Sequence, residues 1–244
     1  MLDNEHEAVF PPASNCTLWR YMDLTKLLSL LENRRLYFPR ADCFEDPFEG
    51  ALSRASVDFI RDPSTNGGLP EHAIEQFIMH AEEQKKKMYI SCWNSSDHES
   101  AAMWKLYLQS NEGVAIRTDH DSLCDALEKS DLRIRTTMVH YVDYDKQVIP
   151  MGNLLFPYVC KRLSFSHENE LRAIIWSLED VNKDKISDIA SSVEIENEPE
   201  KLIKSVHVSP TAPNWFGNLV AQLIVRYSLD VPVERSSLYD RPAY

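Results

Sequence analysis

The sequence predicts one α+β domain, with a mixed, mostly antiparallel central sheet flanked by helices. Two observations predict this fold class. Segments whose apolar residues recur at helical spacing are interspersed with short segments rich in strand-forming residues. The 244 residues contain no internal repeat, no low-complexity tract and no clear linker, so a single domain accounts for the whole chain.

The first part of the chain begins with residues 1–15, which we expect to form a flexible leader. An amphipathic helix follows a suitable N-cap, Asp23. Its leucines recur at helical spacing, at Leu24, Leu27, Leu28 and Leu31. The segment "RLYF" has the composition of a short strand, which Pro39 ends. Two further helices, residues 51–60 and "EHAIEQFIMHAEEQKKK", flank the loop "RDPSTNGGLP".

The remaining elements are predicted from the same patterns. Strands are expected at "MYISCW", "GVAIRT", "LRIRTTMVHYV", "ELRAIIW" and "VHVS", and an edge strand at "VPVERSSLY". Helices are expected at "AAMWKLYLQS", "DHDSLCDALEK" and "APNWFGNLVAQLIVRYS". Residues 178–204 are polar and acid-rich with no apolar period, so we expect a polar insertion there.

Composition restricts the function. The formal net charge of −12 gives no electrostatic attraction to phosphate backbones, so non-specific nucleic-acid binding is not expected. The 5 cysteines are widely spaced without a C-x-x-C pair, which argues against a structural zinc site and a disulfide framework. No apolar run reaches the ~18 residues that span a membrane, and the first residues lack the order of a signal peptide. We expect a cytoplasmic protein that does not enter a membrane.

Arg20 is the first candidate site residue. It lies between Trp19 and Tyr21 in "LWRYM", where a strand would point the two rings to one face and the arginine to the other. A guanidinium held by neighbouring rings presents a bidentate fork to phosphate or carboxylate. The alternative is an arginine at a strand edge, held in an ion pair.

Ser91 is the second candidate, in "YISCWNSSD". It is predicted to share one strand face with Tyr89 and Trp93, while Ile90 and Cys92 take the other face. A serine inside a buried apolar strand needs a hydrogen-bond partner. That partner could be a ligand or a catalytic carboxylate, or the serine could bond within its own surroundings.

Glu168 and Glu170 are the third candidate group. If "ELRAIIW" is a strand that begins near residue 167, both carboxylates lie on one face with Cα atoms roughly 7 Å apart. Carboxylates this close raise one another's pKa or share the polarising of a hydroxyl. The alternative is a polar strand entry in which Glu170 pairs with Arg172 or Lys161.

The segment "CFEDPFEG" is the fourth candidate. Asp46 as N-cap, Pro47 at the first helical position and Glu49 at the third would form a capping box, so a helix entry explains most of the motif. The remaining question is whether this helix start also faces a cleft.

These segments occur in an order that resembles a known family: "WRYM", "LENRRLYFPRADCFEDPFEG", "YISCWNSSDHESAAMWKLYLQSNEGVAIR" and "KRLSFSHENELRAIIW". Over most of residues 18–176 the chain resembles the bacterial family called domain of unknown function 2971. The most specific motifs are F-x-D-P-F-E, matched by "CFEDPFEG", and M-W-x-x-Y, matched by "MWKLY". The family name carries no established activity.

A second resemblance is to ADP-ribosyltransferases, which carry an arginine, a serine and an E-x-E motif in this order. The resemblance implies a split sheet, NAD as cofactor, and a toxin or phage-defence effector. Glu170 would stabilise an oxocarbenium-like transition state, Glu168 would help the acceptor, and Ser91 would orient the site. The residues implied to bind NAD are Arg20, Tyr21, Tyr37, Asp46 and Trp93. The chain departs from the usual S-T-S triplet, because it reads Ser91-Cys92-Trp93.

Two other functions remain open from the residues. A metal-dependent nuclease or hydrolase would use clustered carboxylates around a divalent ion, with Asp46, Glu49, Glu168 and Glu170 beside Lys161. A non-catalytic binding module would use rings along a groove, with Trp93, Trp104 and Tyr107 as candidates. Convergence of Arg20, Ser91 and Glu170 in one cleft would favour the transferase over both.

Overall fold

The computed structural model describes residues 2–66, 68–108, 110–179 and 191–242. The strands are β1 (Thr17–Asp23), β2 (Arg35–Pro39), β3 (Met88–Ser95), β4 (Gly113–Asp119), β5 (Ile134–Met138), β6 (His140–Val142), β7 (Cys160–Arg162), β8 (Glu170–Trp176), β9 (Ser192–Glu196), β10 (Ser205–Val208) and β11 (Val233–Arg235). The helices are α1 (Leu24–Asn33), α2 (Arg54–Arg61), α3 (Pro63–Asn66), α4 (Glu71–Lys85), α5 (Ala101–Tyr107), α6 (His120–Glu128), α7 (Phe156–Val159), α8 (Pro199–Leu202) and α9 (Asn214–Arg226).

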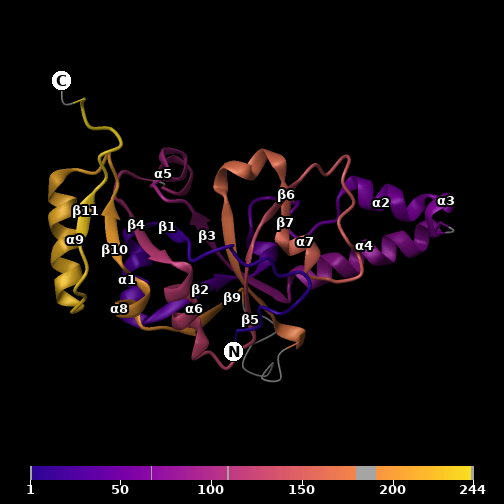
Figure 1. Ribbon diagram of the computed structural model, residues 1–244, viewed down its shortest axis with the longest axis horizontal. Helices are drawn as coiled ribbons and strands as arrows, with labels where there is room; N and C mark the ends of the chain where they lie inside the picture. The colour runs from indigo at the N-terminus through magenta and orange to yellow at the C-terminus, as the bar shows by residue number, and fades with distance from the viewer. Residues whose placement is uncertain (1, 67, 109, 180–190, 243–244) are drawn as a thin grey trace.

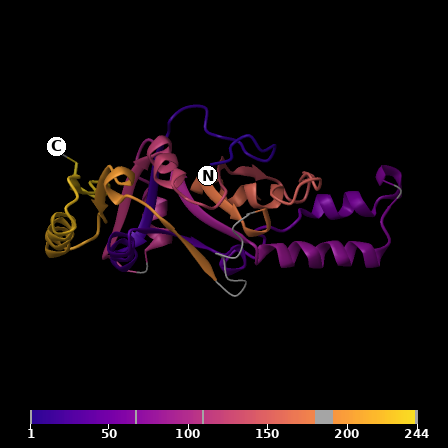
Figure 2. The ribbon, with the colours of Figure 1, turned by 90° about the horizontal axis from the view of Figure 1, so that it is seen from below.

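The central sheet is mostly antiparallel, which confirms the predicted fold class. Its strand order is β11-β10-β4-β1-β3-β8-β5, and the β10–β11 pair is the parallel one. Two small sheets, β2–β9 and β6–β7, lie beside it. Helix α9 covers the β11 end, and α2 and α4 project from the opposite end as a two-helix arm (Figures 1 and 2). No described helix is long and apolar enough to cross a membrane.

The sheet is split between β1 and β3. Strand β1 pairs with β4 from Thr17 to Asp23, but with β3 only at Leu18 and Trp19. Strand β3 pairs with β8 along almost its whole length, from Met88 to Asn94. The two halves of the sheet therefore share only a short seam, and β1 and β3 separate beyond it.

Each face of the sheet buries its own set of side chains. The largest core packs α1, α6 and α9 against one face and includes Tyr89 and Trp93. Ile90 and Cys92 point to the other face, into a second core with Tyr158. The predicted alternation along "YISCW" is thus confirmed. On the same side as this second core, α5 packs against β1 and β4.

Residues 2–10, part of the segment predicted as a flexible leader, are bound to the rest of the domain. The backbone N–H of Asp3 donates to the Ile134 carbonyl at 2.9 Å, and the N–H of Met138 donates to the Phe10 carbonyl at 2.8 Å. Ala8 is fully buried. Strand β5 lies at the edge of the sheet. The leader binds backbone groups of β5 and thereby shields this edge.

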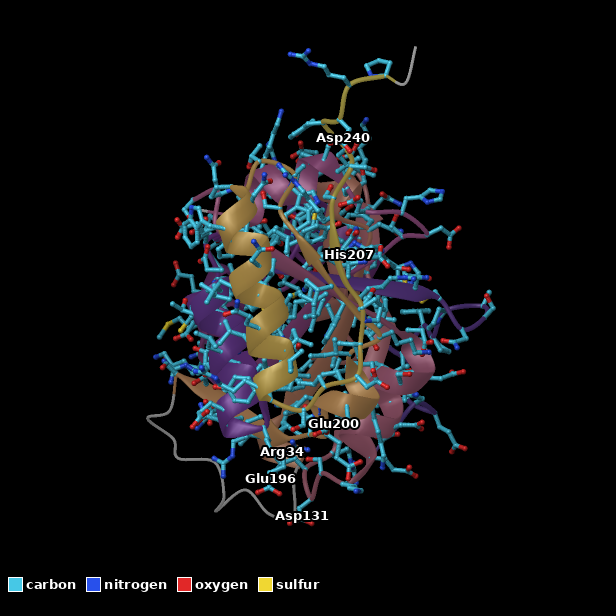
Figure 3. The ribbon with its side chains drawn as sticks, turned by 90° about the vertical axis from the view of Figure 1, so that its left-hand side faces the viewer. Arg34, Asp131, Glu196, Glu200, His207 and Asp240 are labelled. Carbon is cyan, nitrogen blue, oxygen red and sulfur yellow. The ribbon has the colours of Figure 1, made fainter. Side chains whose placement is uncertain are left out.

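The predicted insertion at 178–204 lies partly outside the described residues, since 180–190 are not among them. Its described end is not a surface excursion: β9 pairs with all of β2, and Ile195 is buried in the main core. The pattern was missed because the alternate positions of β9, such as Glu194, are acidic. After β9 the chain forms α8, whose Glu200 makes an ion pair at 2.7 Å with Arg34, the residue that follows α1 (Figure 3).

The predicted capping box at "CFEDPFEG" is also wrong. Residues 47–50 form a turn, and α2 starts later, behind Ser53, whose hydroxyl accepts the N–H of Ser56. Gly50 has φ +67° and faces the Tyr158 ring so closely that a Cβ would lie 2.4 Å from it. A glycine is therefore required at this turn, and the turn directs Glu49 into the protein interior.

Candidate functional site

A cavity of about 530 Å³ lies in the split between β1 and β3. Strands β1, β3 and β8, helices α1 and α5, and the β2–β9 sheet contribute its walls. Six of the residues predicted from the sequence line it: Arg20, Tyr21, Tyr37, Trp93, Tyr107 and Glu170. The split makes this possible because side chains from both faces of the sheet reach the same space.

Arg20 is held by its neighbours in the wall of the cavity. Its guanidinium carbon lies 5.4 Å from the centre of the Trp93 ring, and Nη2 donates to the Tyr37 carbonyl at 3.0 Å. Burial lowers the pKa of Arg20 to about 10, so the group stays charged at neutral pH. No described carboxylate pairs with it, which contradicts the ion-pair alternative and leaves donors for a ligand.

Tyr21 is fixed by a different set of contacts. Its hydroxyl accepts the backbone N–H of Ser100 at 2.7 Å, and its ring meets Trp104 edge to face at 4.9 Å. Burial raises the pKa of Tyr21 to about 12, so it remains a neutral phenol. Trp19 and Tyr21 share a face, as predicted, with ring centres 6.4 Å apart. These rings form a rigid wall.

Ser91 does not line the cavity. It is fully buried, and its hydroxyl accepts the Trp93 indole N–H at 3.1 Å. The predicted meeting of three groups is therefore limited to Arg20 and Glu170. Ser91 bonds within its own surroundings and acts on the cavity only through the orientation of Trp93.

Glu170 and Glu194 are carboxylates that line the cavity. Both oxygens of Glu170 are bound by cations. Lys161 Nζ donates to Oε1 at 2.7 Å and Arg172 Nε donates to Oε2 at 2.6 Å. Burial alone would raise the pKa of Glu170, but Arg172 and Lys161 hold it well below its usual range. The sequence-based alternative, in which Glu170 pairs with Arg172 or Lys161, is correct for both partners.

Glu49 completes this buried network from the turn that Gly50 ends. Its two oxygens accept from Arg172 Nη2 and Nη1 at 2.7 and 2.8 Å. Arg172 also donates to the Tyr158 carbonyl at 2.8 Å. Lys161 Nζ lies 3.4 Å from Glu49. Each member of the network is therefore bound by at least two others.

Glu168 lies behind the cavity and does not line it. It ends a 3₁₀ helix, Leu163–Glu168, and its carboxylate pairs closely with Lys161. Burial and the neighbouring Glu170 raise the pKa of Glu168 to about 8 despite that lysine. Two buried carboxylates share one lysine, so the proton stays on Glu168. The prediction that both glutamates lie on one strand face is wrong, because β8 begins only at Glu170 and Asn169 between them has φ +39°.

Asp46 also lies outside the cavity wall. It pairs with Arg162 at 2.8 Å, and the Arg162 guanidinium carbon lies 4.1 Å from the centre of the Phe48 ring. Phe44, by contrast, lines the cavity. The motif "CFEDPFEG" thus supplies one ring to the wall and one carboxylate, Glu49, to the network behind it.

Asn94 is a wall residue that sequence analysis missed. It lies opposite Glu170 in the β3–β8 register. Its Nδ2 donates to the Glu168 carbonyl at 2.6 Å, while Oδ1 is buried without a hydrogen-bond partner among the described residues. Nothing in the sequence distinguished this asparagine, because its role depends on the pairing of two strands far apart in the chain.

Three carboxyl groups of the metal-dependent alternative come together, those of Glu49, Glu168 and Glu170, but the Lys161 ammonium lies between them. Lys161 contacts Glu49, Glu168 and Glu170, so its ammonium is located where a divalent ion would have to bind. No group of three or more His, Cys, Asp or Glu side chains in the described ranges is arranged to hold a metal. Of the rings named for the binding-module alternative, Trp93 and Tyr107 line the cavity, whereas Trp104 is a core residue.

We expect Glu168→Gln to flatten the pH dependence of stability. The folded protein keeps a proton on Glu168, with a pKa of about 8, that the unfolded chain releases near 4.5. The contribution of Glu168 to stability is therefore full below about pH 4.5 and falls as the pH rises towards 8. In urea unfolding, the free energy of unfolding of the variant should rise relative to that of the wild type between about pH 5 and about pH 8. A constant difference would contradict a raised pKa.

Comparison with known proteins leaves the family open. No family model matches the chain, so the resemblance to domain of unknown function 2971 is not confirmed, and no curated protein matches it. Among solved structures, Thermus sp. 2.9 DarT in complex with NAD+ matches with TM-score 0.42 and 8% identity, covering 93% of this chain and 98% of that one. The same protein with carba-NAD+ matches at TM-score 0.39 and 8% identity, covering 92% and 96%. TM-scores below 0.5 do not establish a common fold, so the site has to be judged on its own residues.

Proposed function

We propose that this protein is an NAD-dependent enzyme of the ADP-ribosyltransferase type, with its site in the cavity between β1 and β3. The observation that carries the proposal is that Arg20 and Glu170, from opposite sides of the split sheet, line one cavity. Its volume of about 530 Å³ is within the range of ligand pockets, roughly 300–1,000 Å³.

The wall residues suit NAD. Arg20 offers guanidinium donors that no described carboxylate occupies, and such donors bind phosphate oxygens. Tyr37, an exposed ring in the cavity wall, provides surface for a base. Asn94 Oδ1, a buried acceptor without a partner among the described residues, suits a ligand N–H or O–H. An unpaired buried acceptor is costly, and a ligand donor would remove that cost.

The proposed reaction breaks the bond between ribose C1′ and the nicotinamide nitrogen. The bonding electron pair leaves with nicotinamide, and positive charge grows on the ribose. An acceptor nucleophile then bonds to C1′ and gives its proton to solvent. Glu170, which Arg172 and Lys161 keep ionised, would stabilise the developing positive charge. As an anion fixed before the reaction, it requires no reorganisation during it.

The test is incubation with NAD labelled in the adenylate half, with and without a cell lysate. We expect nicotinamide release and label transfer by the wild type, and a loss of about 100-fold or more in Glu170→Gln. Glu71→Gln is the matched control. Glu71 is the first residue of α4 and pairs with the exposed Arg61, outside the cavity wall. Binding of NAD without turnover would instead indicate a binding module, and neither binding nor turnover would reject the proposal.

A further inference from the structure

Five ionisable side chains form one buried network, and only Glu170 among them lines the cavity. The others are Glu49, Lys161, Glu168 and Arg172. Among the five, only Glu170 can therefore contact a bound ligand directly. This arrangement separates the group that can contact a ligand from the groups that control it.

The orientation of the Glu170 carboxylate is determined from both sides. Lys161 binds Oε1 at 2.7 Å and Arg172 binds Oε2 at 2.6 Å. The backbone is held as well, because the Glu170 N–H donates to the Tyr141 hydroxyl at 2.9 Å. A carboxylate has about four lone-pair directions. Lys161, Arg172 and a hydrogen bond with Glu168 take three of them, so one remains for a ligand.

The two cations differ in how they are bound. Arg172 is anchored independently of Glu170, by the bidentate pair with Glu49 and by the Tyr158 carbonyl. Lys161 Nζ contacts the carboxyl groups of Glu49, Glu168 and Glu170, and it lies 4.8 Å from the centre of the Phe165 ring. Lys161 is therefore the cation that Glu170 shares with Glu168.

We infer that Lys161 is a positioning residue that keeps the Glu170 carboxylate ionised and oriented towards the cavity. Glu168 helps to hold Lys161 in place. This inference rests on the proposed function, because it concerns Glu170, the carboxylate that acts in the proposed reaction. It also gives Glu168 a role different from acceptor activation, since Glu168 lies behind the wall.

Other titratable groups near Glu170 do not obscure the effect of Lys161. Apart from the network, the neighbours are Cys92, Tyr107 and Tyr141, from β3, α5 and β6. Burial raises the pKa of each of them, so all three are neutral at physiological pH. A change in the titration of Glu170 after replacement of Lys161 therefore reports the loss of the ammonium.

The test follows Glu170 itself, by ¹³C NMR of protein labelled at the glutamate carboxyl carbons, with Glu170→Gln identifying the resonance. In Lys161→Met we expect Glu170 to titrate about 1 to 3 pH units higher than in the wild type, because an opposite charge has been removed. Lys161→Arg should restore the wild-type titration. The matched control is Lys85→Met, which removes a buried lysine that contacts Glu82 and the Pro47 carbonyl instead.

In the NAD assay, the acid limb of kcat should move upwards with the NMR titration while KM changes less than about threefold. An unchanged Glu170 titration in Lys161→Met, or an equal shift in Lys85→Met, would overturn the inference. If Lys161→Met does not fold, Glu49→Gln/Lys161→Gln removes one charge of each sign and allows the same measurement. Absence of NAD turnover in the wild type would reject the proposed function, and the NMR comparison would still decide the role of Lys161.

Discussion

Arg172→Met is expected to reduce the free energy of unfolding by about 3–5 kcal/mol. Arg172 is fully buried and donates to Glu49, Glu170 and the Tyr158 carbonyl. The variant retains most of the side-chain volume but leaves two buried carboxylates with Lys161 alone. The penalty comes from these uncompensated charges, since removing one partner of a buried ion pair costs more than the pair contributes.

Urea unfolding at neutral pH measures this loss. The matched control is Arg61→Met, which removes a bidentate arginine–glutamate pair at the surface, with Glu71. Exposed pairs contribute about 0–1 kcal/mol, so the control should remain close to the wild type. In Glu49→Gln/Arg172→Met, one carboxylate is neutralised, and we expect part of the loss to be recovered. A loss below about 1 kcal/mol in Arg172→Met would contradict the charged state of the network.

Arg20→Ala is expected to weaken NAD binding by about 10- to 100-fold. A hydrogen bond to a charged group contributes about 1.5–3 kcal/mol, and each 1.4 kcal/mol is about tenfold in Kd. Arg20→Lys keeps the charge but loses the planar fork, which stacks 5.4 Å above Trp93. We therefore expect the lysine variant to lie between the wild type and Arg20→Ala.

Calorimetry with two ligands tests whether Arg20 binds phosphate. Nicotinamide riboside lacks the pyrophosphate, so its affinity should change little in Arg20→Ala, whereas that of NAD should fall. Arg117→Ala is the matched control, because Arg117 also stacks on a tryptophan, Trp19, at 5.9 Å, but does not line this cavity. Equal losses for both ligands would show that Arg20 supports the fold of the cavity rather than a phosphate.

Local patterns predicted the local structure well. Leu27 and Leu31, taken as one face of a helix, are buried in α1, and the alternation along "YISCW" separates Tyr89 from Ile90 into two cores. These predictions succeeded because each side chain's burial follows from the period of its own element. The capping box at Asp46 failed because Glu49 is buried against Arg172, and Gly50 with φ +67° turns the chain where a helix would continue.

The order of Arg20 and Glu170 in the chain, their strand positions and the acids beside them are properties of the sequence alone. Only the tertiary structure decided that β1 separates from β3 after Trp19, which opens the cavity. It also decided that Ser91 bonds the Trp93 indole and that Glu168 is behind the wall. The physical reason is that pairing between distant strands, and the sharing of buried charges that it enforces, depend on contacts that no local pattern encodes.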